Sequence, residues 1–328
     1  MYIGIMNTYN IPHTSLIVSR LAYGCMNLGG WDNSALTAER VALTDRAVQT
    51  ALELGINFFD HADIYGRGKS EEAFGEVLRR SPSLRQQMVL QSKCGIRFAD
   101  DPNPGDPHRY DFSAAHIVMS VEGTLHRLKI ETLDILLLHR PDPLVEPDEV
   151  AGAFSALQNS GKVRYFGVSN HSPEQIELLK MSIDQPLVVN QLELNILHSY
   201  LIGEGILANQ EHTPYPAAAG TLDYCRRNKI MVQAWAPVAN GALIDPPTDA
   251  PARVQSTAVL VAKLADKKGT TREAIALAWL LRHPAGIQPV IGTTQPERLR
   301  ASASADQVEL SREEWWALFN VGRGAPPP

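Results

Sequence analysis

Short apolar, β-rich runs alternate with helix-like segments along nearly the whole chain of 328 residues. A run that is apolar on both faces is typical of a strand inside a parallel sheet, and a helix between two such runs is the usual crossover. We expect strands at 19–24, 57–60, 88–93, 133–139, 163–169, 187–194, 231–236 and 288–292. Eight strands with helical crossovers predict an α/β protein with the (β/α)8 TIM barrel architecture.

Helix start and stop signals lie between the expected strands. Ser70 and Ser172 are expected N-caps, the run 270–273 (TTRE) is expected to cap a further helix, and Gly55 and Gly269 are expected C-terminal stops. The expected helices are 37–54, 70–80, 113–128, 148–159, 172–180, 221–228, 256–268, 270–283, 296–302 and 312–321.

A doubly wound sheet is the rival architecture. Its Gly-x-Gly-x-x-Gly fingerprint is missing after the first expected strand, which favours the barrel. The chain has no clear linker or internal repeat, so we expect a single barrel domain over 1–328. Three irregular stretches are rich in Pro, Gly or Asp and lie near 97–112, 201–220 and 240–255. We expect them to be either loops at the C-terminal mouth of the barrel or ordinary variable surface loops.

Composition narrows the kinds of partner and compartment. The net charge is −6 and no block of Lys or Arg occurs, which disfavours nucleic acid and anionic membranes as partners. Three widely separated cysteines suit a reducing compartment, and no apolar run is long enough to span a bilayer. Residues 1–18 carry no Lys or Arg and make a poor signal peptide. We therefore expect a soluble cytoplasmic protein, and the sequence makes no prediction of its oligomeric state.

Four chemically suited side chains follow the expected strands. Asp60, Lys93 and His139 end three of the strands, and Tyr65 lies in the loop after Asp60. The carboxyl ends of parallel barrel strands meet at one mouth, so we expect the four side chains to converge there. An acid, a phenol, an amine and an imidazole can together deliver a proton to a carbonyl oxygen. Because proton delivery alone reduces nothing, such a site also implies a hydride donor.

Tyr65 is the expected acid. Its ordinary pKa of about 10 is high for proton transfer at neutral pH. An ammonium group ~4 Å away would contribute about 4 kcal/mol at an effective dielectric constant of ~20, or roughly three pKa units as an upper bound. We therefore expect Lys93 to bring the pKa of Tyr65 toward neutrality. We also expect Asp60 to keep Lys93 charged, and His139 to donate a hydrogen bond to the substrate oxygen.

These residues also have ordinary structural interpretations. Taken singly, Tyr65 would more often be a turn residue, and Lys93 a solvated charge at a strand end. Asp60, His61 and Asp63 could suggest a metal site, but neighbouring residues of a strand point to opposite faces. We therefore expect no metal.

Five motifs resemble those of the aldo-keto reductase family, and most closely its bacterial oxidoreductase branch. They occur in the family's order between about residues 21 and 319, as GINFFDHADIYG (55–66), SKCG (92–95), LLLHRPD (136–142), GKVRYFGVSN (161–170) and VIGTT (290–294). The resemblance implies a barrel that reduces small-molecule aldehydes and ketones with NADPH, without metal or flavin. It implies Tyr65 as general acid, Lys93 as its electrostatic activator, Asp60 as the partner of Lys93, and His139 as the substrate-orienting group.

The resemblance also implies how the cofactor would be held. Ser169, Asn170 and Gln191 would hold the nicotinamide carboxamide, and the ring of Trp235 would stack on the nicotinamide. Backbone at Ala236, Pro237, Val238 and Gly241 would lie beside the pyrophosphate, and Gly24, Cys25 and Met26 would line the mouth. Gly292, Thr293, Thr294 and Arg298 would hold the far end of NADPH.

The residues expected at the far end of NADPH match the family's pattern at some positions and depart from it at others. Thr294 and Glu297 can open a helix whose N-terminus attracts an anion, and Arg298 could bind the 2′-phosphate. Gly292 stands where a Lys often helps to bind that phosphate in the family, and the adenine-contacting Glu-Asn pair is replaced at 301–302. We therefore expect NADPH, with NADH as the alternative. Pocket walls would come from the mouth loops and from Trp31, Phe98 and Arg140.

Two other functions remain open at this point. The same site could belong to a nucleotide-binding regulatory or redox-sensing subunit with little turnover, as in some relatives. A barrel lyase could use Lys93 as a Schiff-base amine, although Asp60 would keep that amine protonated.

Overall fold

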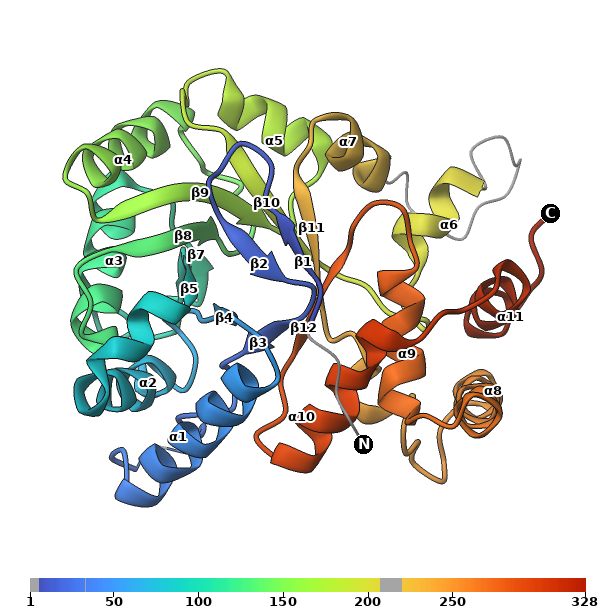
Figure 1. Cartoon of the computed structure of the whole chain (residues 1–328). Coiled ribbons are helices and arrows are strands. Elements are labelled where there is room, and N and C mark those ends of the chain that lie inside the picture. The colour runs from blue at the N-terminus through green and yellow to red at the C-terminus, as the bar shows by residue number, and fades with distance from the viewer. Residues whose placement is uncertain (1–5, 33, 207–219) are drawn as a thin grey trace.

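A closed parallel barrel forms the centre of the protein in a computed structural model, which describes residues 6–32, 34–206 and 220–328. Its strands, in chain order, are β3 (Ala22–Gly24), β4 (Phe58–Asp60), β5 (Val89–Cys94), β8 (Leu133–Leu138), β9 (Val163–Ser169), β10 (Leu187–Glu193), β11 (Met231–Trp235) and β12 (Gln288–Ile291). Each strand pairs in parallel with the next one along the chain, and β12 closes the barrel on β3. The expected (β/α)8 barrel is confirmed, and the doubly wound sheet is wrong because this sheet has no edge (Figure 1).

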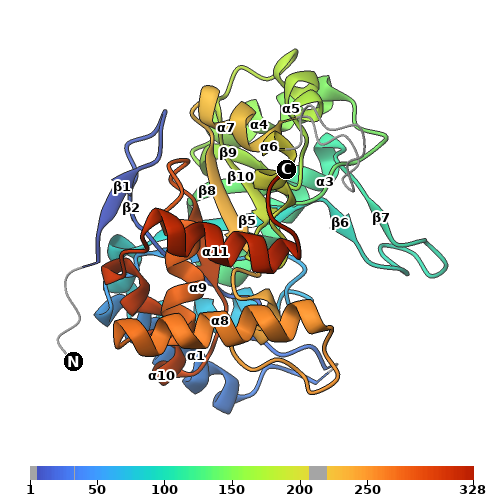
Figure 2. The same cartoon turned by 90° about the vertical axis from the view of Figure 1, so that its right-hand side faces the viewer.

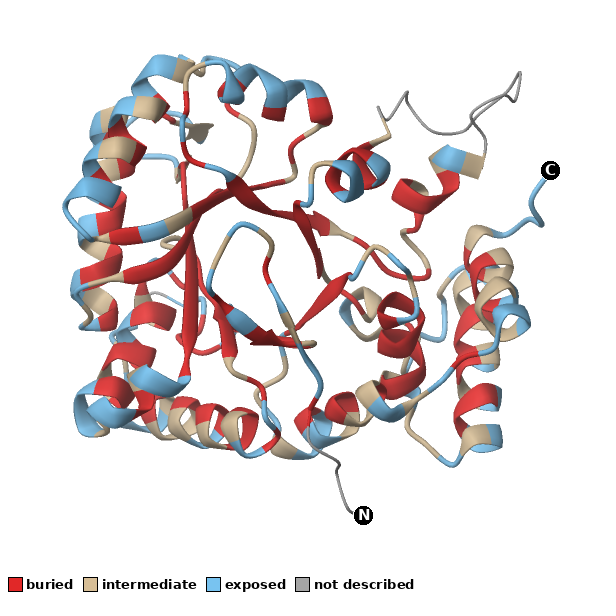
Figure 3. Ribbon diagram, turned by 45° about the horizontal axis from the view of Figure 1, so that its top comes forward, coloured by how far each residue is buried: buried red, intermediate tan, exposed pale blue. Residues whose placement is uncertain are grey.

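Helices surround the barrel. They are α1 (Ala38–Glu53), α2 (Lys69–Arg80), α3 (Ala114–Leu128), α4 (Pro147–Asn159), α5 (Pro173–Lys180), α6 (Tyr200–Ile206), α7 (Thr221–Arg227), α8 (Ala252–Lys268), α9 (Arg272–Leu281), α10 (Pro296–Ala303) and α11 (Arg312–Arg323), with short 3-10 turns η1 (Pro82–Gln87), η2 (Ala239–Gly241) and η3 (Ser304–Gln307). Figure 3 shows that the strands are buried, and that the helices turn buried faces inward and exposed faces outward. Among the described residues, no helix combines the length and apolarity needed to cross a membrane.

The helix signals were mostly confirmed. Ser172 forms the expected capping box with Gln175, Thr271 caps α9, and Gly269 ends α8 in the left-handed conformation at φ +60°. The Ser70 cap is wrong. The residue before α2 is Gly68, and the Ser70 hydroxyl instead accepts a hydrogen bond from a loop amide and donates one to a loop carbonyl between β3 and α1.

An N-terminal hairpin, which the sequence did not predict, closes the barrel at the amino ends of its strands. It consists of β1 (Thr8–Asn10) and β2 (Ile17–Ser19), which pair antiparallel. Ile11, Leu16 and Val18 of this hairpin pack against residues inside the barrel such as Phe58 and Val189. The hairpin therefore plugs the amino end, so that ligands must enter at the carboxyl ends of the strands.

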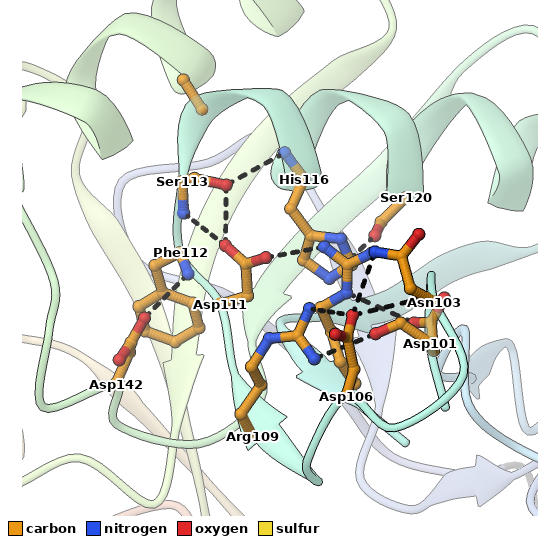
Figure 4. Close-up of polar contacts among 12 residues, drawn as sticks. Asp101, Asn103, Asp106, Arg109, Asp111, Phe112, Ser113, His116, Ser120 and Asp142 are labelled. Carbon is orange, nitrogen blue, oxygen red and sulfur yellow. Dashed lines mark hydrogen bonds and ion pairs between the residues drawn. The ribbon is translucent and has the colours of Figure 1, made fainter. Parts of the chain in front are cut away.

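The expected irregular stretch 97–112 contains a second hairpin, formed by β6 (Ile96–Arg97) and β7 (Arg109–Tyr110). In Figure 2 it projects on the side opposite to β1 and β2, and thus at the carboxyl end of the barrel. Its base is held by Arg97, which pairs with Asp101 and Asp111 at 3.3 and 2.8 Å. Asp111 also accepts hydrogen bonds from Ser113, the N-cap of α3 (Figure 4).

The other two stretches that were expected to be irregular also contain helical residues. Stretch 201–220 begins inside α6, and its residues 207–219 lie outside the described part of the chain. Stretch 240–255 starts in η2 and ends in α8, which begins at Ala252 and not at 256 as expected.

Candidate active site

The four predicted residues meet at the carboxyl end of the barrel. β4, β5 and β8 are neighbours in the barrel, which brings Asp60, Lys93 and His139 together at the carboxyl ends of these strands. The Lys93 ammonium lies 2.8 Å from each carboxylate oxygen of Asp60 and 3.1 Å from the Tyr65 hydroxyl. The rings of Tyr65 and His139 meet edge-to-face with centroids 6.1 Å apart. The convergence expected from the sequence is therefore present in the structure.

Lys93 is fully buried, and its hydrogen-bonding capacity is used up. An ammonium group has three N–H donors. Here they serve three acceptors, which are the Asp60 carboxylate, the carbonyl of His61 at 2.8 Å and the Tyr65 hydroxyl. Burial alone would lower the pKa of Lys93, but attraction from Asp60 and Tyr65 outweighs burial and raises it. Lys93 is therefore held as a cation at neutral pH.

The direction of the Lys93–Tyr65 hydrogen bond determines where the phenol proton points. Because Lys93 has no acceptor, the Tyr65 oxygen must accept this bond, and the Tyr65 proton is left to donate elsewhere. Tyr65 is partly exposed, so that proton is available to a molecule at the mouth.

The expected drop in the pKa of Tyr65 is wrong. Desolvation by burial raises the pKa of Tyr65 above 10, and the Lys93 ammonium only partly offsets this effect. The sequence argument counted the attraction of Lys93 and omitted the cost of ionising a phenol away from water. Tyr65 is consequently protonated at neutral pH, which is the form that donates a proton.

His139 is an uncharged imidazole. Burial lowers its pKa well below 6.5, and repulsion from the Lys93 and Arg140 cations adds to the effect. Its Nδ1 is buried and has no hydrogen-bond partner among the described residues. A neutral imidazole carries one N–H, so His139 can donate a single hydrogen bond. Because it is uncharged, it does not compete with the Lys93 ammonium for the Asp60 carboxylate.

Ser169, Asn170 and Trp235 form a connected cluster beside His139. The Asn170 amide nitrogen donates to Ser169 Oγ at 2.8 Å and to the carbonyl of His139 at 3.2 Å, while its Oδ1 accepts from Trp235 Nε1 at 3.1 Å. Ser169 Oγ in turn donates to the carbonyl of Gln191 at 2.9 Å. The donors of Ser169 and Asn170 are thus used within the protein, and what the cluster can still offer a ligand is the remaining acceptor capacity of Asn170 Oδ1.

Gln191 faces the barrel interior. Its Nε2 donates to Asp60 Oδ1 at 3.1 Å and to Gln233 Oε1 at 2.9 Å. No described residue donates to its Oε1, so this oxygen is the part of Gln191 that can receive a ligand N–H.

The backbone after β11 is unusual in a way that suits ligand binding. Ala236, Ala239 and Asn240 have positive φ values of 49°, 51° and 53°, a region that residues with a side chain rarely adopt. Gly241 follows at φ 94°. Such strain is concentrated at functional sites, and this loop follows the carboxyl end of β11, at the mouth of the barrel.

The far-end residues follow β12. Gly292 is exposed, and its carbonyl accepts a hydrogen bond from the Asn27 side chain at 3.0 Å. Arg298 is exposed in the first turn of α10, and its side chain makes no hydrogen bond or ion pair with any described residue. The expected opening of this helix at Thr294 is wrong, because the N-cap is Gln295, whose amide bonds the Thr293 hydroxyl.

The prediction for Cys25 is also wrong. Its side chain is fully buried in the core between strands and helices, so it does not line the mouth. Gly24 is buried at the end of β3, and Met26 is exposed.

A pocket of about 650 Å³ opens beside Trp235. Its lining residues come from the carboxyl ends of β8 to β11 and from the helices that follow them; they are Arg140, Pro141, Asn170, His171, Ser172, Glu174, Gln175, Leu192, Glu193, His198, Tyr200, Thr221 and Trp235. Arg140, expected as a wall, also lies over the Trp235 ring at 5.8 Å. Phe98 packs instead under the guanidinium of Arg67, at 4.5 Å, and Trp31 is half exposed outside this pocket.

Sequence reasoning missed three buried amides at the centre of the barrel, those of Gln91, Gln233 and Gln288. Gln91 Nε2 donates to Asp60 Oδ1 at 2.6 Å, the shortest hydrogen bond that Asp60 receives. The signal was clearest at Gln233, which interrupts the otherwise apolar strand β11, and weaker at Gln91, which shares β5 with Ser92 and Lys93, and at Gln288, which begins β12.

Comparison with known proteins agrees with this geometry. The model of the aldo/keto reductase family matches residues 20–321. The chain is 37% identical to the uncharacterized oxidoreductase YcsN of Bacillus subtilis, covering 94% of this chain and 96% of the relative. It is 33% identical to a 6-dehydroglucose reductase of Agrobacterium fabrum, with 94% and 96% covered. The solved glycerol dehydrogenase of Gluconobacter oxydans superposes with a TM-score of 0.80 at 26% identity, over 96% of this chain and 94% of that one. The fold, the site and these similarities together establish that the chain belongs to the aldo/keto reductase family.

Proposed function

We propose that this protein reduces an aldehyde or ketone to an alcohol, reversibly, with Tyr65 as general acid. The observation that carries the proposal is the hydrogen bond from Lys93 to the Tyr65 oxygen, which leaves the phenol proton to face the mouth. As a substrate oxygen gains negative charge, Tyr65 gives up that proton, and the Lys93 ammonium stabilises the phenolate that forms. Asp60 keeps Lys93 charged and in place through contacts of 2.8 Å.

His139 orients the substrate in this proposal. As a neutral group beside Tyr65, it donates a hydrogen bond to the carbonyl oxygen and holds the oxygen within reach of the phenol. Burial excludes water from Lys93 and Asp60, which strengthens every charge interaction at the site.

The residues present fit a nicotinamide cofactor, whose chemistry is to supply the hydride. The acceptor oxygens of Asn170 and Gln191 suit the amide N–H of a carboxamide, and the strained loop after β11 suits a pyrophosphate. Arg298, exposed and unpaired among the described residues, suits the 2′-phosphate that distinguishes NADPH from NADH. We therefore propose NADPH as the preferred cofactor.

The lyase alternative is disfavoured. An amine that attacks a carbonyl needs an unprotonated lone pair, whereas all three donors of Lys93 are engaged and its pKa is raised. A regulatory subunit would retain the same site and show little turnover, so measured turnover separates it from the proposed enzyme.

Replacement of Tyr65 by Phe tests the proposal. We expect kcat for NADPH-dependent reduction to fall by about 10²–10⁴-fold, because the proton donor is lost. The Kd for NADPH, followed by quenching of tryptophan fluorescence, should stay within about twofold, since Tyr65 makes no polar contact with the proposed cofactor residues. Reductase activity that survives in Tyr65→Phe would rule out Tyr65 as the acid.

The substrate panel follows from the pocket and from the relatives. Most of the side chains that line the pocket beside Trp235 are polar, and they include Glu193, Gln175 and Thr221. Two similar proteins are named for their action on 6-dehydroglucose and on glycerol. We therefore propose that polyhydroxylated carbonyl compounds are reduced with higher kcat/KM than apolar aldehydes of similar size. Equal or better turnover of the apolar aldehydes would contradict this assignment.

A further inference from the structure

Four buried glutamines lie on the inner face of the barrel below the proposed catalytic residues. In the strand register, Gln191 of β10 pairs with Gln233 of β11, and Gln233 pairs with Gln288 of β12. On the other side of the barrel, Gln91 of β5 pairs with Asp60 of β4. Residues in register across a parallel sheet point to the same face, so these side chains share one interior layer.

The amides form a continuous hydrogen-bonded chain across the barrel. It starts at the carbonyl of Ser19, which accepts from Gln288 Nε2 at 2.8 Å, and Gln288 Oε1 accepts from Gln233 Nε2 at 2.9 Å. Gln233 Oε1 then accepts from Gln91 at 2.8 Å and from Gln191 at 2.9 Å. Both of these amides also donate to Asp60 Oδ1. The chain thus joins the plugged end of the barrel to the partner of Lys93.

The two ends of the chain determine the orientation of every amide in it. A backbone carbonyl and a carboxylate are acceptors only. Gln288 must therefore present Nε2 to Ser19, which obliges Gln233 to present Oε1 to the other two amides. Gln91 and Gln191 are then left with N–H groups toward Asp60. No alternative flip of one amide satisfies its neighbours, so the network has a single direction.

We propose that this amide chain positions the Asp60 carboxylate for its role beside Lys93, and that Gln91, Gln233 and Gln288 are positioning residues of the reductase. The inference rests on the proposed function, because it assigns these glutamines a role through Asp60 and Lys93. It extends the site beyond the groups that touch substrate or cofactor.

The contacts at Asp60 explain how the chain acts. Oδ1 receives N–H groups from Gln91, Gln191 and Lys93, and Oδ2 receives Lys93. The two amides hold the carboxylate plane, so that both oxygens stay 2.8 Å from the ammonium. Without them the carboxylate can rotate, and Lys93 loses the arrangement that directs its remaining N–H to Tyr65.

The stability cost of the chain argues that packing is not its purpose. Apolar side chains of similar volume would fill a barrel interior without any need for partners. Within the chain of glutamine amides, Gln91 Oε1 remains buried with no donor among the described residues, which is energetically unfavourable. This cost is offset by the two hydrogen bonds that Gln91 Nε2 donates, one to Gln233 and one to Asp60, so the contact with Asp60 is what the amide at this position provides.

Methionine substitutions test the chain, since methionine preserves the length of glutamine and removes the amide. Gln91→Met removes the donor to Asp60, Gln233→Met breaks the middle, and Gln288→Met breaks the far end. Gln185→Met is the matched control, because Gln185 is also buried but bonds Ser155 and Gln158 away from this chain. Each variant is measured for kcat, for the Kd of NADPH, and for hydrogen exchange of the Lys93 ammonium by ¹⁵N-lysine NMR without added cofactor.

We expect Gln91→Met to speed the Lys93 exchange about tenfold and to lower kcat about tenfold, the equivalent of one lost hydrogen bond to a charged group. Gln233→Met and Gln288→Met should act in the same direction with decreasing size. The Kd of NADPH should stay within about twofold in Gln91→Met and Gln288→Met, because neither Gln91 nor Gln288 bonds Gln191. If Gln91→Met does not fold, the other two substitutions decide in its place.

Lys93 exchange and kcat that match the Gln185→Met control would overturn the proposal, as would a rise in the Kd of NADPH equal to the fall in kcat. The exchange measurement needs no turnover. If Tyr65→Phe retained activity while Gln91→Met still altered Lys93 exchange, the proposed function would fail and the positioning role of the chain at Asp60 would stand.

Discussion

Replacing Asp60 by Asn would isolate what the Lys93–Asp60 pair contributes to the protein. The change keeps the shape of the side chain and removes its charge, while Lys93 stays fully buried with no other carboxylate of the described residues in hydrogen-bonding contact. The structure makes this a stringent test, because both partners are inaccessible to water and salt.

The magnitude follows from the geometry. Two unit charges 2.8 Å apart attract by about 6 kcal/mol at an effective dielectric constant of ~20, which is an upper limit on the loss. Breaking one side of a buried pair typically destabilises a protein by ~3–5 kcal/mol. We therefore expect Asp60→Asn to lower the free energy of unfolding by about 3–5 kcal/mol near neutral pH.

The pH dependence of this loss has a definite sign. In the parent protein the pKa of Lys93 is raised, so the pair's contribution is complete below the ordinary lysine pKa and is lost only as pH rises through the raised value. In Asp60→Asn, burial without a counter-charge pushes the pKa of Lys93 below the unfolded value. The variant should then recover stability as pH rises, by at most about 1.4 kcal/mol per pH unit.

Urea unfolding followed by tryptophan fluorescence at about pH 6, 7.5 and 9 measures this recovery. Asp134→Asn is the matched control, because Asp134 is equally buried but pairs with Arg85 and Arg164, which keep their charge at all these pH values. A loss in Asp60→Asn that stays constant with pH, as in the control, would refute the reasoning. So would additivity of Asp60→Asn and Lys93→Met within about 0.5 kcal/mol in the double variant.

Three further predictions concern the site. Carbonyl reduction should be nearly independent of pH across the neutral range, whereas alcohol oxidation should rise with pH, because burial raises the pKa of Tyr65 and oxidation requires its phenolate; initial rates in both directions check this. Trp235→Phe keeps a stacking ring but removes the hydrogen bond to Asn170, so the Kd of NADPH should rise about fivefold, for about 1 kcal/mol, in a fluorescence titration. Arg298→Gln should raise the Kd of NADPH at least about tenfold and leave the Kd of NADH unchanged, whereas Arg300→Gln should leave both Kd values unchanged. Equal rises of the two Kd values in Arg298→Gln would exclude a 2′-phosphate contact.

The barrel was predictable because its strands are buried on both faces. The strand Val163–Ser169 lies between two helix signals and is fully buried from Phe166 onward, and its boundaries matched to the residue. The N-terminal hairpin was not predictable in the same way. Its strands have three residues each, one of their faces is exposed, and what orders them is packing of Ile11 and Leu16 into the open end of a barrel that forms elsewhere in the chain.

The sequence predicted which residues meet at the site and where they lie, but it did not predict the direction in which the pKa of Tyr65 is shifted. The strand ends placed Asp60 and Lys93 together, but the pKa of Tyr65 depends on how much water the fold excludes from it. That quantity is set by side chains from several loops, and no spacing along the sequence contains it. The saturation of Lys93 was likewise hidden, because its third N–H is taken by the backbone carbonyl of His61, a contact that no pattern in the sequence indicates.

The glutamine chain shows where such sequence reasoning can be extended. In a parallel barrel, a polar residue at an inward position of an apolar strand must find its partner on another strand, because the strand's own backbone is already paired. Gln191, Gln233 and Gln288 satisfy this requirement through register alone, and the carboxylate of Asp60 supplies the final acceptor. A charged group that needs several donors can therefore be located by looking for amides at matching depths of neighbouring strands. By that reasoning the proposed reductase site is connected by hydrogen bonds from the mouth to the carbonyl of Ser19, at the opposite end of the barrel.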